Sequence, residues 1–237
     1  MHTRSLTRIL PLALFMGGLV SAQPTEEAFA LSRKSVKGDT FSYSLTIETK
    51  VDGFDVKMKG LTSFTVVEVQ PDGTIFEKVE DMGSQVDVAG TQVDLPPQEP
   101  YRQKTSMDGS RVEYLDRPFR SEDARVAQTS SFPFPKGPVK LKEAWTVDFG
   151  GDPKTGAEKA QGTYTIVEKQ GTGDAATVKI EFTYKELVGD KPIDASGTVH
   201  VRLKDGVRTK MDLSARNVPM RPGQAPSDVK ISYVLVP

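Results

Sequence analysis

The chain has no cysteine among its 237 residues and only two histidines. Without cysteine it can form no disulfide, so its stability must come from packing. A chain of about 200 residues buries roughly 70% of its unfolded surface on folding, which allows a core without covalent cross-links. Zinc sites need several cysteine or histidine ligands, and the sequence therefore predicts no metal centre.

The two signs of charge are nearly balanced, with 31 Lys and Arg against 32 Asp and Glu. A surface that binds nucleic acid needs a basic excess, and this composition provides none. Long hydrophobic runs are also scarce, because no run after the N-terminal one approaches the ~18 residues of a membrane-spanning helix. We therefore expect neither a nucleic-acid partner nor a transmembrane segment in the mature chain.

The N-terminus has the three parts of a cleavable signal peptide. Arg4 and Arg8 form a positive region, residues 9–20 are an uncharged apolar run, and small residues follow. At about 1.5 Å per residue this run is much shorter than the ~30 Å hydrocarbon core of a membrane, which argues against a retained anchor. We predict that residues 1–22 are a signal peptide removed before Gln23, and that the product is exported to the periplasm or outside the cell. No cysteine follows the run for lipid attachment.

The strongest hydrophobic periodicity in the chain is two residues, the period of a β-strand. Apolar side chains alternate with polar ones over residues 41–51, and Asp52-Gly53 separates this run from a second one that starts at Phe54. Two alternating runs around Asp-Gly are typical of a β-hairpin. Gly60, where the alternation slips phase, indicates a β-bulge. Similar runs recur to the C-terminus, so the sequence predicts an all-β, antiparallel fold.

At most one short helix is expected, over Ser121 to Ala127, with Ser121 as the N-cap. Proline-rich stretches interrupt the strands at residues 95–101 and 132–138. We interpret both as ordered crossovers, with extended ligands for a protein partner as the alternative. Residues 216–228 are expected to form a long loop before the last strand.

Segments of the first half of the chain recur in the same order in the second half. The matching pairs are residues 63–70 and 163–170, residues 36–41 and 139–145, and residues 108–111 and 205–208. Their nearly equal offsets indicate two copies of one unit, at roughly 31–116 and 139–235. We predict two related sheet halves, residues 23–130 and 131–237, which form one curved continuous sheet or half-barrel, or pack as a sandwich. The alternative is that the two halves form one continuous domain.

This layout resembles a group of uncharacterised exported bacterial all-β proteins built from two repeated sheet halves. The shared features are the signal peptide, the Lys37-Gly38-Asp39-x-Phe41 opening, the repeated Asp-Gly hairpin and the segment from Pro135 to Trp145. The resemblance covers most of the mature chain and implies no catalytic residues. The second half departs from the pattern at Lys142, where the opening glycine is expected.

The mature chain contains few of the residue types and motifs that usually carry out catalysis. Its one histidine, His200, lies in the polar phase of a strand, where we expect a solvated side chain. No G-x-S-x-G elbow presents a serine for a Ser-His-Asp triad. No P-loop or dinucleotide-binding glycine motif is present either. We therefore predict no catalytic, cofactor-binding or metal-binding residues.

Clustered carboxylates are the remaining catalytic candidates. Glu77, Glu80 and Asp81 lie close together, and Glu143 and Asp148 flank the single tryptophan. Two carboxylates across a sugar-lined cleft would suit a glycoside hydrolase. Such clefts usually stack sugars on several aromatic residues, so a carboxylate hydrolase is the weakest functional alternative. We expect these side chains on the solvent face of their strands.

An extended apolar sheet face is the feature that most needs a function. Its aromatic residues are predicted to be Phe41, Tyr43, Phe54, Trp145, Phe149, Tyr164, Phe182 and Tyr184. Such a face must be covered, either by a second layer as a core or by an apolar ligand around which the sheet curls. We expect a noncatalytic cell-envelope protein that binds or carries a lipid or other apolar molecule. The alternative is a structural or protein-interaction module that binds an envelope protein through strand edges or the proline segments.

Overall fold

The computed structural model describes residues 27–118, 120–220 and 225–237, so the predicted signal peptide lies outside the described residues. Among the described residues, no helix is both long and apolar enough to cross a membrane. The elements in chain order are β1 (Ala28–Phe29), β2 (Thr40–Val51), β3 (Phe54–Val69), β4 (Ile75–Val88), β5 (Thr91–Leu95), β6 (Tyr101–Thr105), β7 (Val112–Tyr114), α1 (Ser121–Thr129), β8 (Val139–Lys140), β9 (Ala144–Phe149), β10 (Ala160–Gln170), the 3₁₀ turn η1 (Gly173–Ala175), β11 (Thr177–Glu186), β12 (Asp194–Arg202), β13 (Arg208–Val218) and β14 (Ser227–Val236).

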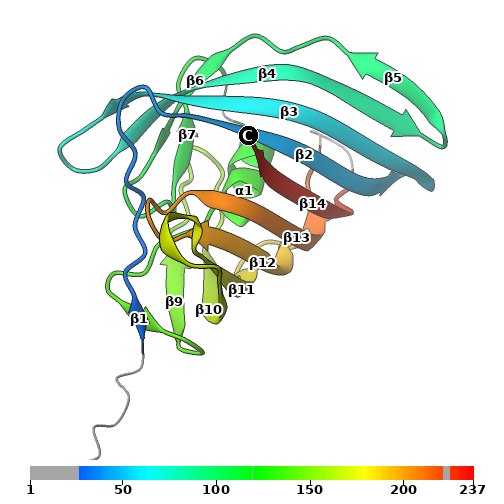
Figure 1. Cartoon of the computed structure of the whole chain (residues 1–237). Helices are drawn as coiled ribbons and strands as arrows, with labels where there is room; N and C mark the ends of the chain where they lie inside the picture. Colours follow the sequence, from blue (N-terminus) through cyan, green and yellow to red (C-terminus); the bar gives the residue numbers. More distant parts are fainter. Residues whose placement is uncertain (1–26, 119, 221–224) are drawn as a thin grey trace, which may run out of the picture.

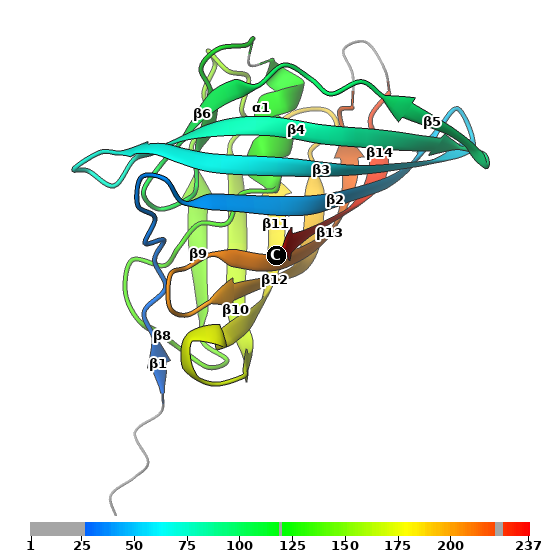
Figure 2. The same ribbon diagram turned by 45° about the horizontal axis from the view of Figure 1, so that its top comes forward.

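One antiparallel sheet, with twelve strands in the part of the chain that the structure describes, dominates the fold. Its order is β7-β6-β4-β3-β2-β14-β13-β12-β11-β10-β9, with β5 paired to β4. The sheet curves strongly, and α1 lies against its inner face (Figure 1). Strands β2 to β4 run across the direction of β9 to β11, as expected when twist accumulates over many strands (Figure 2). The prediction of an all-β, antiparallel fold with a curved continuous sheet is therefore confirmed.

The first hairpin has the predicted turn and bulge. Strands β2 and β3 pair without a break from Thr40 opposite Thr65 to Val51 opposite Phe54. Asp52 and Gly53 make the turn with φ of +50° and +83°. The β3–β4 register shifts between Gly60 and Thr62, which places a bulge at the expected position.

The helix forms where the sequence predicts it, but its cap differs. Helix α1 begins after Arg120, which is the N-cap in extended backbone conformation. The Asp123 carboxylate accepts a hydrogen bond from the Arg120 backbone N–H at 3.3 Å, so the prediction that Ser121 caps the helix is wrong. The physical reason is that Ser121 already has helical geometry, and Asp123 reaches back over the first turn.

The expected long loop over residues 216–228 is shorter than predicted. Strand β13 continues to Val218, and β14 already begins at Ser227. A bulge lies between Ala215 and Val218, with Asn217 at φ +61°, so the strand continues through residues that look like loop. Residues 221–224 lie outside the described part of the chain.

Two turns at corresponding sequence positions have the same geometry. In the first, the Asp39 N–H donates to the Val36 carbonyl at 3.1 Å, and the Asp39 carboxylate accepts from the Val36 N–H at 2.8 Å. In the second, Glu143 and Lys140 make the same two bonds at the same distances. The second strand after each turn also has a matching bulge, after Val66 in β3 and after Ile166 in β10. These likenesses support the predicted duplication, which stays a prediction.

Each predicted half also contacts the Asp-Gly turn of the other. The Lys34 N–H donates to the Asp205 carbonyl at 2.9 Å, and the Phe134 N–H donates to the Asp108 carbonyl at 2.7 Å. The segment before each opening turn therefore crosses to the opposite half of the chain.

Glycine permits this close crossing in both turns. Gly109 and Gly206 have φ of +72° and +70°, which favours glycine. A Cβ atom at Gly109 would lie 2.4 Å from the Phe132 carbonyl oxygen, and one at Gly206 would lie 2.2 Å from that of Ser32. No other residue fits either position without moving the crossing segment.

The hydrophobic core lies mainly under the second half of the sheet. Its buried members come largely from β9 to β14, and Phe29, Leu31 and Phe132 cover them from the crossing segments. Phe132 meets the rings of Trp145 and Tyr164 edge to face, with centroids 6.3 and 5.8 Å apart. The inner face of the second half is therefore a filled core.

Candidate functional site

A cavity of about 260 Å³ lies under the first half of the sheet. Inner-face residues of β2, β3, β4, β6 and β7 form one wall, and the end of α1 with the segment that follows it forms another. Met107 lines the cavity and is 66% exposed, so it marks where the cavity meets solvent. The inner face is thus covered by core side chains over much of the second half and borders this cavity in the first half.

Aromatic rings make up much of the cavity wall. The aromatic lining residues are Phe41, Tyr43, Phe64, Tyr101, Tyr114, Phe132, Phe134 and Tyr233. Tyr43 packs edge to face on Phe64 with ring centroids 5.7 Å apart, and Tyr101 packs similarly on Tyr114 at 5.0 Å. Such walls suit an apolar ligand, because ring faces and edges give large contact area with little lost side-chain freedom.

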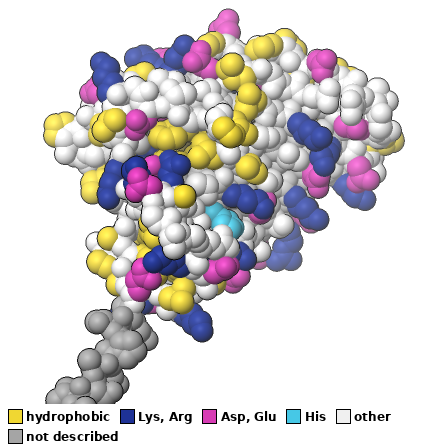
Figure 3. Space-filling model, viewed as in Figure 1, with side chains coloured by type: hydrophobic (Ala, Val, Ile, Leu, Met, Phe, Trp, Pro, Cys, Tyr) yellow, Lys and Arg dark blue, Asp and Glu magenta, His cyan; other side chains and the backbone are white. Residues whose placement is uncertain are grey.

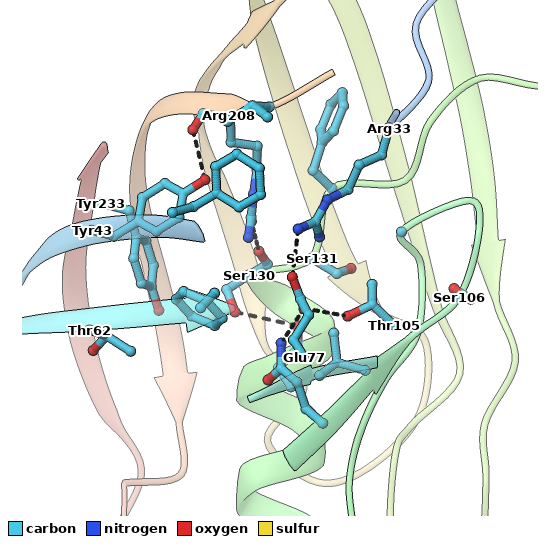
Figure 4. A pocket seen from close by; sticks show the side chains of 18 of the residues that line it. Arg33, Tyr43, Thr62, Glu77, Thr105, Ser106, Ser130, Ser131, Arg208 and Tyr233 are labelled. Atoms are coloured by element: carbon cyan, nitrogen blue, oxygen red, sulfur yellow. Dashed lines mark hydrogen bonds and ion pairs between the residues drawn. The ribbon is translucent and has the colours of Figure 1, made fainter. Parts of the chain in front are cut away.

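A buried carboxylate lies in the same cavity. Glu77 is only 2% exposed, and one of its oxygens accepts from the Arg33 guanidinium at 2.5 Å. The other oxygen accepts from the Gln103 amide at 2.9 Å and from the Thr105 hydroxyl at 3.3 Å. Figure 4 shows Arg33 and Glu77 approaching each other from opposite sides. A buried carboxylate needs such partners, and here both of its oxygens have them.

Sequence reasoning missed Glu77, which was expected on the solvent face of its strand. Its neighbours Ile75 and Val79 are buried, and Glu77 alternates in phase with them. A charged residue in the inward phase of a strand was therefore the available signal. Arg33 and Arg208, which come from distant parts of the chain, carried no comparable signal.

A second arginine enters the cavity from the start of β13. Arg208 donates through Nη1 to the Ser130 carbonyl at 3.0 Å, while its own carbonyl accepts from the Tyr43 hydroxyl at 3.0 Å. Burial raises the pKa of Tyr43, against the opposing effect of the Arg208 and Arg33 charges. Burial likewise raises the pKa of Tyr233. Both phenols therefore stay neutral at physiological pH and act as hydrogen-bonding groups.

The eight aromatic residues predicted to form the ligand face separate into three groups. Phe41 and Tyr43 line the cavity. Phe54 is 58% exposed, at the tip of the first hairpin. The residues that lie in or against the filled core are Trp145, Phe149, Tyr164, Phe182 and Tyr184. The structure therefore brings only two of the eight together at a hollow site.

The other candidate carboxylates make local contacts. Glu80 pairs with Lys78 at 2.7 Å, and Glu143 accepts from the Lys140 N–H at 2.8 Å in its turn. Asp81 accepts from the Gly83 N–H at 2.9 Å. Asp148 accepts from the Gln161 amide at 2.9 Å.

His200 lies on β12, opposite Lys179 and Lys210 on the neighbouring strands. Partial burial, followed by the charges of Lys210 and Lys179, lowers its pKa. Among the described residues, no group of three or more His, Asp or Glu side chains is arranged to hold a metal ion. Lysine and arginine are interspersed with acidic side chains over the face shown in Figure 3.

The fold and the cavity define a class: an open, curved antiparallel sheet with an aromatic cavity that contains charged groups. Comparison with protein-family models and with curated proteins finds no match. Among solved structures, a "putative exported protein with YmcC-like fold" from Bacteroides fragilis matches with a TM-score of 0.31 and 7% identity. The match covers 89% of this chain and all of the other.

Proposed function

We propose that this protein is a noncatalytic, exported carrier that holds an apolar small molecule in the cavity between α1 and strands β2, β3, β4, β6 and β7. The observation that supports this function is the cavity of about 260 Å³ with its aromatic walls. This volume is slightly below the roughly 300–1,000 Å³ of typical ligand pockets, which favours a single small molecule or one lipid chain. The signal peptide predicted over residues 1–22 supports export.

The binding proposal is tested with an uncharged fluorescent probe, N-phenylnaphthylamine, and the mature chain 23–237. We expect saturable binding that Phe64→Asp weakens at least tenfold, because Phe64 lines the cavity and a carboxylate there would be desolvated by the ligand. The matched control is Phe54→Asp, at a position that is 58% exposed and outside the cavity lining. Equal binding by both variants, or no binding by the parent protein, would overturn the proposal.

Core positions are unsuitable for this test. Phe182 is 5% exposed and stacks on Tyr164 with centroids 5.8 Å apart. A charge at Phe182 would unfold the second half whether or not a ligand binds. Mass spectrometry of the protein purified from its native host gives an independent measurement, in which a co-purified lipid is the expected result.

A protein-interaction module is the second candidate, and one observation favours it. Strand β5 is exposed along its whole length, and within the described ranges it pairs with β4 alone, which leaves its other edge free there. A free edge can accept a strand from a partner. A photo-crosslinker at Val93, with Gln92 on the opposite face as the control, would trap that partner in the native envelope. Recovery of no specific product from either position would remove this candidate.

A further inference from the structure

The charge in the cavity is not balanced. Of the residues that the structure describes, three charged side chains line it, namely Arg33, Glu77 and Arg208. Arg33 and Glu77 form an ion pair, and the remaining contacts of the Glu77 carboxylate are with the neutral Gln103 and Thr105. Glu77 therefore neutralises Arg33, and one positive charge is left over.

That charge belongs to Arg208. Its contacts through Nη1 are with the Ser130 carbonyl at 3.0 Å and the Met211 sulfur at 3.8 Å, and neither group carries a charge. Within the described part of the chain, no carboxylate forms an ion pair with Arg208. By contrast, the neighbouring Arg202 pairs with Asp205 at 2.7 Å.

Arg208 lies where its charge can contact a ligand bound in the cavity. The side chain is half-buried and extends beside Arg33 toward Ser130 and Ser131, at the end of α1 (Figure 4). Charged groups out of water are normally paired, because desolvation is costly without a partner. A guanidinium has five N–H donors, and the two contacts of Arg208 leave donors for an anion.

We infer that the cavity takes an anionic amphiphile, with its carboxylate or phosphate group on Arg208 and its apolar chain against the aromatic walls. This inference rests on the proposed function and names the ligand class. The hydroxyl of Tyr43 donates to the backbone carbonyl of Arg208, and so holds the residue that carries this charge. The Arg33–Glu77 pair adds no net charge, so Arg208 supplies the positive charge that the anionic head group meets.

The test compares three ligands with the same eight-carbon chain: octanoate, octyl phosphate and octanol. Titration calorimetry with the mature chain 23–237 gives the affinity of each. A hydrogen bond to a charged group contributes enough for about a 10- to 100-fold preference, so we expect at least one anion to bind that much more tightly than octanol. The better of the two anions identifies the head group.

Variants at Arg208 link this preference to its charge. Arg208→Gln should reduce the affinity for the preferred anion about 10- to 100-fold and change the affinity for octanol less than twofold. Arg208→Lys should keep part of the preference, because it retains the charge but not the forked geometry. Arg216→Gln is the matched control, since Arg216 lies on the same strand, is exposed and pairs with Asp194 outside the cavity. Circular-dichroism melting checks that each variant is folded.

The outcomes separate the inference from the function on which it rests. If octanol binds as tightly as the anions, the cavity is a carrier site without an anion preference, and only the inference fails. Equal loss of octanol and anion binding in a folded Arg208→Gln variant would also overturn the inference, because it would assign Arg208 to the cavity wall alone. If none of the three ligands binds, the proposed function itself fails.

Discussion

At the scale of single residues, Lys142 adopts a conformation that its side chain disfavours. Its φ is +66°, and it occupies the position of Gly38, which has φ +96° in the equivalent turn. Its N–H donates to the Ile166 carbonyl at 2.7 Å, as the Gly38 N–H does to the Val66 carbonyl at 2.9 Å. The sequence departs from glycine here, while the backbone keeps the geometry of the glycine turn.

We predict that Lys142→Gly stabilises the protein by about 0.5–1 kcal/mol. Glycine removes the strain of roughly 1–2 kcal/mol for a left-handed non-glycine residue, and loses part of this gain through greater freedom in the unfolded chain. Urea unfolding of the mature chain measures the change. The reciprocal variant Gly38→Lys should destabilise by more than about 1 kcal/mol, although no atom lies within 4 Å of the added Cβ. Unchanged stability in Lys142→Gly would contradict the argument.

We expect His200 to make the free energy of unfolding depend on pH. Partial burial and the charges of Lys210 and Lys179 lower its pKa in the folded state, so the unfolded state binds the proton more readily. The folded protein should therefore lose stability as pH falls through the ordinary histidine pKa of about 6.5.

The prediction is that His200→Gln reduces this loss between pH 7.5 and pH 5.5. The free energy of unfolding of the variant, relative to the parent, should rise as pH falls through this window and stay constant above it. Urea unfolding at a series of pH values measures the difference. Asp205 and Asp212 also have lowered pKa values, but carboxylates of this kind titrate at more acidic pH and lie outside the window. A parallel pH dependence of parent and variant would exclude a role for His200.

At the scale of elements, α1 is held to the sheet by a buried ion pair. Arg125 donates to both oxygens of Glu186 on β11, at 2.9 and 2.6 Å, and to the Lys191 carbonyl at 3.0 Å. The Glu186 carboxylate is fully buried and also accepts from the Ile193 N–H at 2.6 Å. Helix α1 carries residues of both the filled core and the cavity wall, so this pair fixes the helix on which both depend.

We predict that Arg125→Met destabilises the protein by about 3–5 kcal/mol, because it leaves a buried carboxylate without its cation. Adding Glu186→Gln should recover part of that loss, since a neutral amide oxygen still accepts from the Ile193 N–H. Thermal unfolding measures stability, and hydrogen exchange of the α1 amides shows whether the helix loosens first. The control is Arg216→Met, which breaks an exposed pair and should cost less than about 1 kcal/mol. A double variant less stable than Arg125→Met would contradict this account.

The elements could be predicted from the sequence to a much greater extent than the site. Alternation and the Asp52-Gly53 turn are local signals, and they gave the first hairpin and its bulge at Gly60. The cavity depends on contacts between distant segments, since Arg33 and Glu77 are 44 residues apart. Phe41 and Tyr43 could be predicted as inward-facing. The sequence does not show that Phe41 and Tyr43 line a cavity while Tyr164 is buried in the core. That difference depends on where α1 and Phe132 pack against the sheet.

At the scale of the whole molecule, the two predicted halves are joined through several contacts besides the connecting chain. Strand β14, the last of the chain, lies between β13 and β2 and pairs with β2 from Val229 opposite Thr49 to Val236 opposite Ser42. The halves also exchange the segments that contact the Asp-Gly turns, through Lys34 in one direction and Phe134 in the other. These contacts argue that the chain folds as one cooperative unit, although its sequence indicates two copies of one unit.

We therefore predict that neither residues 23–130 nor residues 131–237 fold alone. The first fragment would lose β14 and leave the edge of β2 that pairs with it unpaired. The second would lose α1 and its Arg125. It would also lose Phe29 and Leu31, which cover part of its core. Circular-dichroism melting should give one sharp transition for residues 23–237 and none for either fragment.

An equimolar mixture of the two fragments provides the decisive comparison. If the exchanged segments and the β2–β14 pairing hold the halves together, mixing should restore strand signal and a melting transition that depends on concentration. A cooperative transition in either fragment alone would show an autonomous domain. The contacts between the two halves would then not be required for folding. Recovery only on mixing would mean that the cavity forms in the assembled sheet alone. In that case the carrier site would belong to the whole molecule, because Arg208 comes from one half and most of the aromatic wall from the other.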